Sequence, residues 1–331
     1  MSSPLMWIIL IVILALVFDF FNGFHDSANA ITTSVTTHAL NPKIAVLVAA
    51  SLDFLGALSS TAVAKTIGKG LVDPGLITLQ VVGAALVGAI LWNILTWWFG
   101  IPSSSSHALI GGIVGAVIAA NGFSAIKLKG LEKVLSALLL SPLLGMAIGF
   151  TVMVLLLWIF RNKSAFQYNN YFRKAQIISS ALTAFSHGTN DAQKSMGIIT
   201  MALVSGGFLS SFKVPFWVIL ACASAISLGT YSGGWRIVRT MGTKITRIQP
   251  MNGFAADLSS SAVIFGATYF GVPVSTTHVV SSAIMGSGST RRLTAVNWGV
   301  AKQIVTAWFV TIPVSALAAM LLYWVFSFLG G

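Results

Sequence analysis

The polar motifs of this 331-residue chain occur twice, and this duplication constrains the fold more than any other feature. Residues 100–107 read GIPSSSSH, and residues 271–278, at an offset of 171, read GVPVSTTH. Residues 23–29 read GFHDSAN, and residues 188–194, at an offset of 165, read GTNDAQK. The two pairs follow the same order at nearly the same spacing, so the repeat extends over the whole chain.

The composition places both halves in a membrane. Hydrophobic residues make up 56% of the chain and charged residues 8%, with a mean hydropathy of +0.89, whereas soluble domains carry about 25% charged residues. Spans of roughly 20 residues leave room for about ten membrane-crossing segments and no soluble domain. We predict an all-α polytopic membrane protein, because backbone polar groups in lipid must be satisfied within each segment.

Glycine and proline interrupt several apolar segments at matching places in the two halves, at Gly23, Pro102, Gly188 and Pro273. Matched interruptions are typical of secondary transporters, which form one site from broken helices of two repeats. We therefore expect broken helices or re-entrant hairpins. The stretch 76–121 is either two spans or one such hairpin with Pro102 near its tip.

The basic residues predict the topology. We divide the chain into a first repeat (1–160), a basic linker (161–174) and a second repeat (175–331), and the linker is expected in the cytoplasm. When the loops on either side of the linker are assigned in turn, eleven Lys and Arg residues fall on the cytoplasmic side and six on the opposite side. Both termini then face away from the cytoplasm, the first span is retained, and the repeats are inverted. Basic residues spread over short loops predict no nucleic-acid partner.

The duplicated proline–serine/threonine motifs predict two helix starts within the membrane. Pro102 and Pro273 suit the beginning of a helix, and the hydroxyls that follow suit its cap. A helix N-terminus carries unpaired N–H donors and the positive end of the helix dipole, which together favour phosphate or sulfate. The hydroxyl residues assigned to this anion site are Ser104, Ser105, Ser106, Ser275, Thr276 and Thr277.

Asp26 and Asp191 are the acidic members of the second motif pair. A carboxylate within a transmembrane segment costs about 2.5–3.5 kcal/mol on insertion scales, so we expect a functional role. Two carboxylates beside an anion need a cation between them or a proton on one of them. This requirement predicts cation-coupled transport, although ion pairs with Lys194 or another base are the alternative reading.

Two positions break the symmetry of this pair. His25 corresponds to Asn190, and Asn29 corresponds to Lys194. A buried Lys can stand where the other half would place a cation, and a His beside Asp26 titrates near neutrality.

The two histidines that follow the tips and the five other acids also suggest roles. His107 and His278 have no His or Cys partner at ligand spacing, which favours local hydrogen bonding over metal binding. Asp73 and Glu132 are expected in loops. Asp19 and Asp53 are expected to pair with bases or to line the pathway, and Asp257 to be a cation ligand or a helix-end charge.

With these motifs in place, the chain resembles the inorganic phosphate transporter (PiT) family over essentially its full length. The resemblance rests on the motif pair 23–29 and 188–194 and on the two proline–serine/threonine tips. It implies a cation-coupled phosphate symporter of the cell (inner or plasma) membrane with an inverted-repeat helical fold, in a homodimer. It also implies the residues that surround phosphate and its coupling cation: Asp26, Asn29, Ser104, Ser105, Ser106, Asp191, Ser275, Thr276 and Thr277.

Sodium-coupled members of the family have Asn before each Asp and Asn three residues after it. Asn190 and Asn29 keep this pattern, whereas His25 and Lys194 depart from it. The departures resemble the bacterial low-affinity, proton-coupled branch, which is similar to carriers of metal–phosphate complexes. We therefore assign Asn190 and Lys194 to the phosphate site and His25, with the two acids, to proton coupling.

Several alternatives stay open at this point. Sodium-coupled symport and a sulfate permease of the same fold share the motifs, and the ligands of any co-transported divalent metal are not assigned. A channel needs a continuous polar stripe, whereas the polar residues cluster at the breaks. A hydrolase is disfavoured because Ser106 and His107, like Ser186 and His187, are adjacent and do not face each other on a helix. We expect no enzymatic activity and no resident cofactor.

Overall fold

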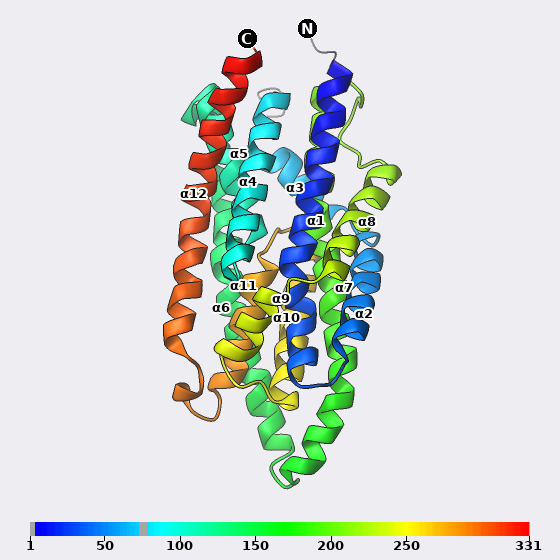
Figure 1. The fold of residues 1–331 in the computed structure, drawn as a ribbon, viewed down its shortest axis with the longest axis vertical. Helices are drawn as coiled ribbons and strands as arrows, with labels where there is room; N and C mark the ends of the chain where they lie inside the picture. The colour runs from blue at the N-terminus through cyan, green and yellow to red at the C-terminus, as the bar shows by residue number, and fades with distance from the viewer. Residues whose placement is uncertain (1–3, 73–77, 331) are drawn as a thin grey trace.

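The computed structural model describes residues 4–72 and 78–330, and these residues form helices joined by short connections (Figure 1). The first half consists of α1 (Pro4–Thr36), α2 (Pro42–Ala57), α3 (Ala62–Gly70), α4 (Leu79–Phe99), α5 (Ser105–Asn121), the 3₁₀ turn η2 (Phe123–Ala125) and α6 (Leu128–Ile159). The second half consists of α7 (Ala165–Ser205), α8 (Phe216–Ser232), α9 (Trp235–Arg239), the π-helical turn η3 (Thr240–Lys244), α10 (Pro250–Tyr269), α11 (Thr276–Ser289), the 3₁₀ turn η4 (Leu293–Ala295) and α12 (Trp298–Gly330).

The two halves repeat the same order of elements in opposite orientations. Each has a long helix, a bent helix pair, a helical hairpin, a 3₁₀ turn and a final long helix. An isolated β-bridge joins matching places in each half, Val72 with Ile126 and Thr246 with Val296. In Figure 1 both termini lie at the upper end, whereas the α6–α7 connection lies at the lower end, so α1 and α7 run in opposite directions. The predicted all-α fold with two inverted repeats is confirmed.

The hairpins α4–α5 and α10–α11 turn back in the interior. Gly100 and Gly271 stand just before the tips, each with φ of +64°, a left-handed conformation that glycine adopts without strain. Pro102 and Pro273 follow in the tips. The returning helices α5 and α11 have 17 and 14 residues, fewer than the roughly 20 that cross a bilayer. The re-entrant reading of 76–121 therefore fits better than two full spans.

Fewer helices than the expected ten segments meet a test of length and apolar composition. By length and composition, four described helices can cross a membrane, namely α1, α4, α6 and α12. The bent pairs α2–α3 and α8–α9–η3, with angles of 72° and 56°, raise this number to six. The other four expected segments are α5, α7, α10 and α11, which do not meet this test. The 41-residue α7 is less apolar than these helices because polar residues occupy its middle.

The segment 161–174, expected to link the repeats, includes the first turns of α7, which begins at Ala165. The interruptions expected at two glycines are absent. The helices α1 and α7 run unbroken through Gly23 and Gly188, where the sequence suggested interruptions. These glycines serve close packing instead: a Cβ would lie 2.1 Å from the carbonyl oxygen of Ile226 at Gly23, and 2.1 Å from that of Asp53 at Gly188.

The halves are interlocked rather than side by side. The hairpin helix α5 of the first half packs against α12, and α11 of the second half packs against α6. The indole Nε1 of Trp308 on α12 donates a hydrogen bond of 3.2 Å to the carbonyl of Pro102 in the first tip. Each tip is therefore positioned by the opposite half, which brings the two tips together.

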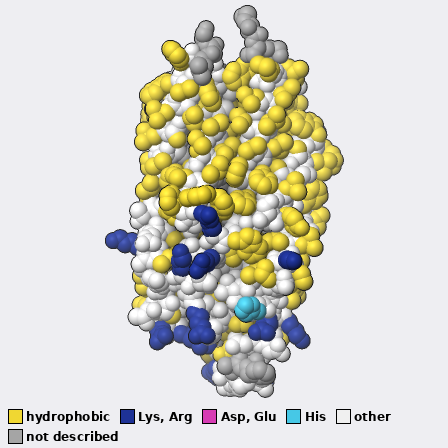
Figure 2. Space-filling model, in the orientation of Figure 1, with side chains coloured by type: hydrophobic (Ala, Val, Ile, Leu, Met, Phe, Trp, Pro, Cys, Tyr) yellow, Lys and Arg dark blue, Asp and Glu magenta, His cyan; other side chains and the backbone are white. Residues whose placement is uncertain are grey.

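The surface fits a protein embedded in lipid. The face in Figure 2 is apolar over its upper part, whereas its Lys and Arg side chains gather toward the lower end, where α6 and α7 connect. Large apolar side chains on several helices are more than half exposed, among them Phe99, Trp158, Phe216 and Phe328. Such a surface is stable in contact with acyl chains.

The close helix crossing at Gly188 gives a testable prediction. We expect Gly188→Ala to lower the melting temperature in detergent by at least about 5 °C, because the added methyl group would collide with the backbone of α2 at Asp53 and force the helices apart. Gly266→Ala on α10 is the matched control, since nothing lies within 4 Å of its Cβ position. Equal melting temperatures for both variants would show that the crossing tolerates separation.

Candidate functional site

A buried polar cluster lies where the two hairpin tips meet the middle of α1 and α7. Asp26 is 1% exposed and Asp191 is fully buried, so neither carboxylate is solvated by bulk water. All sequence-predicted site residues are buried as well. The structure brings most of them into one cluster drawn from both halves.

Asp26 on α1 is surrounded by groups that donate to it. The His25 ring places Nδ1 2.8 Å from Oδ1, and the Thr277 hydroxyl donates to the same oxygen at 2.8 Å. The Ser105 hydroxyl, at the start of α5, lies 3.4 Å from Oδ2. Both tips therefore contact one carboxylate.

Asp191 on α7 is paired with a buried amine. Lys194, one turn later, places Nζ 2.8 Å from Oδ1, and its side chain is fully buried. The Thr276 hydroxyl links the acids, at 3.2 Å from Oδ2 of Asp191 and 3.3 Å from Oδ2 of Asp26. Asn29, the counterpart of Lys194, donates to the hydroxyls of Thr277 at 3.1 Å and Thr276 at 3.4 Å.

His187 is a site residue that sequence reasoning missed. Its Nε2 lies 3.5 Å from Oδ2 of Asp191 and 4.0 Å from Oδ2 of Asp26. Its Nδ1 lies 2.9 Å from Oδ1 of Asp53 on α2, whose Oδ2 accepts a hydrogen bond of 2.5 Å from Thr230. The available signal was its position one helical turn before Asp191.

The two carboxylate oxygens of each acid have different surroundings. In both acids a basic residue, His25 or Lys194, engages Oδ1. The two Oδ2 atoms face a common space together with Nε2 of His187 and the Thr276 hydroxyl. The ligand atoms of Asp26, His187 and Asp191 lie within 4.8 Å of one another, an arrangement that can hold a divalent metal ion. A carboxylate at Nδ1, here Asp53, is the usual support for a metal-binding imidazole.

The predicted helix starts at the tips are confirmed. Ser104 caps α5 by accepting a hydrogen bond from the amide of His107 at 3.1 Å, and Ser275 caps α11 through His278 at 3.3 Å. The amides of the first helical residues have no carbonyl partner within their own helix. Ser106 donates at 2.9 Å to the carbonyl of Val274, which ties one tip to the other.

His25 and Asn190 occupy equivalent positions and hold the loops before the tips. His25 Nε2 lies 3.2 Å from the Thr96 hydroxyl at the end of α4. Asn190 donates to the Thr268 hydroxyl at 2.9 Å, and its Oδ1 accepts from the amide of Val274 at 3.4 Å. Asn190 therefore braces the second tip and does not contact the acids.

The two histidines after the tips lie against each other, with ring centroids 4.5 Å apart, and His278 also stacks on Trp308. The expected local hydrogen bonds are absent at two of their atoms: His107 Nδ1 and His278 Nε2 have no partner within residues 4–72 and 78–330. These residues pack the two tips together behind the acids.

The remaining acids follow no single pattern. Asp53 pairs with His187, as expected for an acid with a basic partner, and Asp257 accepts from Thr33 and Ser179 at 2.8 and 3.0 Å. Asp19 is fully buried on α1. The loop prediction for Glu132 was wrong, because it lies within α6, and Asp73 lies outside the described residues.

Comparisons with known proteins find relatives over nearly the whole chain. A family model described as "Phosphate transporter family" matches residues 22–171 and 161–319. A "Probable low-affinity inorganic phosphate transporter" of Bacillus subtilis (strain 168) is 51% identical over 332 residues, covering 99% of each chain. One of Rhizobium meliloti (strain 1021) is 50% identical over 315 residues, covering 95% of this chain and 94% of that protein.

A solved structure described as "The sodium-dependent phosphate transporter" has a TM-score of 0.89 with this chain at 27% sequence identity. The match covers 98% of this chain and 99% of that chain. The full-length agreement includes both repeats and both tips.

The buried ion pair of Lys194 and Asp191 gives a prediction about stability. We expect Lys194→Met to destabilise the protein by about 3–5 kcal/mol, because the buried Asp191 loses the amine that pairs with its Oδ1. The double variant with Asp191→Asn should regain most of that loss. Both are compared with the wild type by thermal and denaturant unfolding in detergent, and a fully stable single variant would show that the pair contributes nothing.

Proposed function

The chain belongs to the phosphate transporter family, and we propose that it is a secondary active symporter that brings inorganic phosphate into the cell with protons. It is a multi-pass membrane transport protein and not an enzyme. The single observation that carries the proposal is the meeting of two buried helix N-termini beside two buried carboxylates. Such a site offers donors for an oxyanion and acceptors for the cation that offsets its charge.

The phosphate end of this site is formed by the tips. The first-turn amides of α5 and α11, the hydroxyls of Ser105 and Thr276, and the Lys194 ammonium supply donors and positive charge in one place. Phosphate is tetrahedral and accepts hydrogen bonds on every side, so donors from two opposed helices suit it. A sulfate ion has similar geometry, and its competition with phosphate uptake tests the selectivity.

Protons are the proposed coupling ions because of the two positions that break the repeat. Lys194 places a positive charge 2.8 Å from Asp191. An Asn at position 194, like Asn29 in the other half, would instead offer a neutral oxygen ligand for sodium. His25 places an imidazole, a group that can accept and release a proton, with Nδ1 2.8 Å from Oδ1 of Asp26. Sodium coupling is the alternative, since the solved relative is described as sodium-dependent.

A divalent metal ion travelling with phosphate is a finer proposal that the geometry supports. The open Nε2 of His187 and the two Oδ2 atoms form a mixed nitrogen–oxygen set, which suits a divalent metal better than sodium. Phosphate oxygens would complete the coordination. The metal ion would be part of the cargo.

We also propose the cellular arrangement. The lower end in Figure 1, which carries the α6–α7 connection, faces the cytoplasm because most of the basic residues lie there, and both termini then face away from it. We place the protein in the cell (inner or plasma) membrane, as a homodimer on the basis of the family resemblance.

Ser105 tests the phosphate site. We expect Ser105→Leu to abolish phosphate binding, because the side chain would fill the space between the tips and remove a hydroxyl that contacts Asp26. The matched control is Ser224→Leu on α8, whose exposed hydroxyl bonds only to the carbonyl one turn earlier. Binding and uptake are measured on variants that have the melting temperature of the wild type. Normal uptake by Ser105→Leu would contradict the assignment of Ser105 to the phosphate site.

Coupling is tested in proteoliposomes from which sodium is rigorously excluded. We expect an inward proton gradient alone to drive phosphate accumulation, and His25→Asn to flatten the pH dependence, because Asp26 loses its titratable neighbour. Chelation of divalent metals in the same assay, with uptake measured for phosphate and for manganese, shows whether metal accompanies phosphate. Uptake that requires sodium and ignores the proton gradient would contradict proton coupling.

A further inference from the structure

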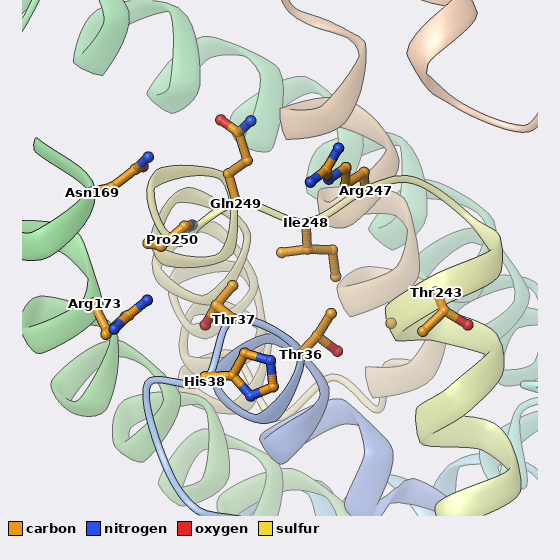
Figure 3. Close-up of a pocket in the computed structure, with 11 residues that line it drawn as sticks. Thr36, Thr37, His38, Asn169, Arg173, Thr243, Arg247, Ile248, Gln249 and Pro250 are labelled. Carbon is orange, nitrogen blue, oxygen red and sulfur yellow. The ribbon is translucent and has the colours of Figure 1, made fainter. Parts of the chain in front are cut away.

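A cavity lies at the end of the molecule that carries most of the basic residues. It has a volume of about 710 Å³ and is lined by the end of α1, the beginning of α7, η3 and the segment that leads into α10. Figure 3 shows Asn169 and Arg173 on α7 to one side, Arg247 and Thr243 to the other, and Thr37 between them. The cavity is separate from the buried cluster of Asp26 and Asp191.

The two arginines at this cavity have no acidic partner. No ion pair within residues 4–72 and 78–330 includes Arg173 or Arg247. The α10 helix begins at the cavity with Pro250, and its cap residue Gln249 makes no side-chain hydrogen bond to the first turn. Two guanidinium groups and an uncapped helix N-terminus therefore face one space, and all three favour an anion.

A polar route connects this cavity to the acids. On α1, Asp26, Asn29 and Thr33 follow one another at spacings of three and four residues, so they lie on one helix face. Thr37, just past the end of α1, continues this row, and its amide donates to the carbonyl of Thr33 at 3.1 Å. The Thr37 hydroxyl donates to Oε1 of Gln176 at 2.6 Å.

The route continues on α7 and α10. Asp257 accepts from Thr33 at 2.8 Å and from Ser179 at 3.0 Å, and the hydroxyls of Thr183 and Ser261 are 3.0 Å apart. These side chains are buried, so the route is closed between the cavity and the acids. Gln176 is fully buried, and its Nε2 has no hydrogen-bond partner among the described residues.

The inverted repeat supplies an internal control for this route. Beyond Asn29, the counterparts of these polar residues in the other half are apolar, because the repeat offsets of 165 and 171 relate Thr33 to Ile198 and Asp257 to Leu86. The same offset of 165 relates Gln176 to Ile11, Ser179 to Leu14 and Thr183 to Phe18. Helix packing alone does not need polar residues at these places, since the apolar half packs without them.

We propose that this cavity is a second, weaker binding site for phosphate, with Arg173 and Arg247 as its main ligands. Phosphate would bind here transiently as it passes between the central site and the cytoplasm. The assignment to the cytoplasmic side rests on the proposed function. The anion site itself does not, because it follows from the two arginines and the polar route. A phospholipid headgroup has the same phosphate chemistry, so the test separates the two sources.

The test uses the full-length protein and a single introduced thiol. Cys222 is the only cysteine and is fully buried, so Thr243→Cys places one accessible thiol at the cavity wall. We expect inorganic phosphate to slow modification of this thiol by an anionic methanethiosulfonate reagent. The protection should persist when Ser105→Leu blocks the central site.

Removing the arginines should remove the protection. We expect Arg173→Gln with Arg247→Gln to raise the phosphate concentration for half-protection about tenfold or more. The matched control is Lys43→Gln with Lys163→Gln, which removes two exposed charges at the same end outside the cavity. If the control pair weakens protection equally, or if chloride at matched ionic strength protects equally, the effect is screening and the proposal is wrong.

The remaining outcomes keep this proposal distinct from the proposed function. Protection that disappears in Ser105→Leu would overturn the second site and leave the central site intact. Uptake that survives Ser105→Leu would overturn the central site without touching the cavity. Protection by phosphatidylglycerol in nanodiscs, with no further effect of inorganic phosphate, would assign the cavity to a lipid headgroup and overturn the proposal.

Discussion

Two carboxylates buried close together inside a membrane protein are the constraint on which the rest of this structure depends. Each intramembrane charge costs about 2.5–3.5 kcal/mol on insertion scales, and Asp26 and Asp191 are near enough to share the Thr276 hydroxyl. The cost is offset by basic groups at 2.8 Å from each acid, His25 and Lys194, and by hydroxyls from both tips. The interlocked hairpins hold those hydroxyls in place.

The inverted repeat provides a symmetric frame, and the function arises where the symmetry is broken. Asn29 and Lys194 are equivalent in position, yet one donates to the second tip and the other neutralises an acid. Polar side chains line the route from the acids toward the basic end of the molecule, whereas their counterparts are apolar. A duplicated scaffold can thus give its two membrane faces different chemistry without changing the fold.

Much of the fold and the acid–hydroxyl cluster was predictable, because the motifs that form them are duplicated and chemically distinctive. The His187–Asp53 pair was missed because its partners are 134 residues apart, and no local pattern indicates that α2 crosses α7. Gly23 and Gly188 were misread because glycine marks either a break or a close approach, and only the neighbouring helix decides. The start of α7 had a usable signal, the capping box of Ser164 and Gln167, which the basic residues obscured.

The central claim is that phosphate binds between the N-termini of α5 and α11, beside both acids. The most direct measurement is a crystal structure with arsenate, an isostere of phosphate, located by its anomalous scattering. The account predicts a strong peak within hydrogen-bonding reach of the first-turn amides of both helices and of the Thr276 hydroxyl. A saturating concentration of arsenate that inhibits uptake but gives no peak at this position would contradict it.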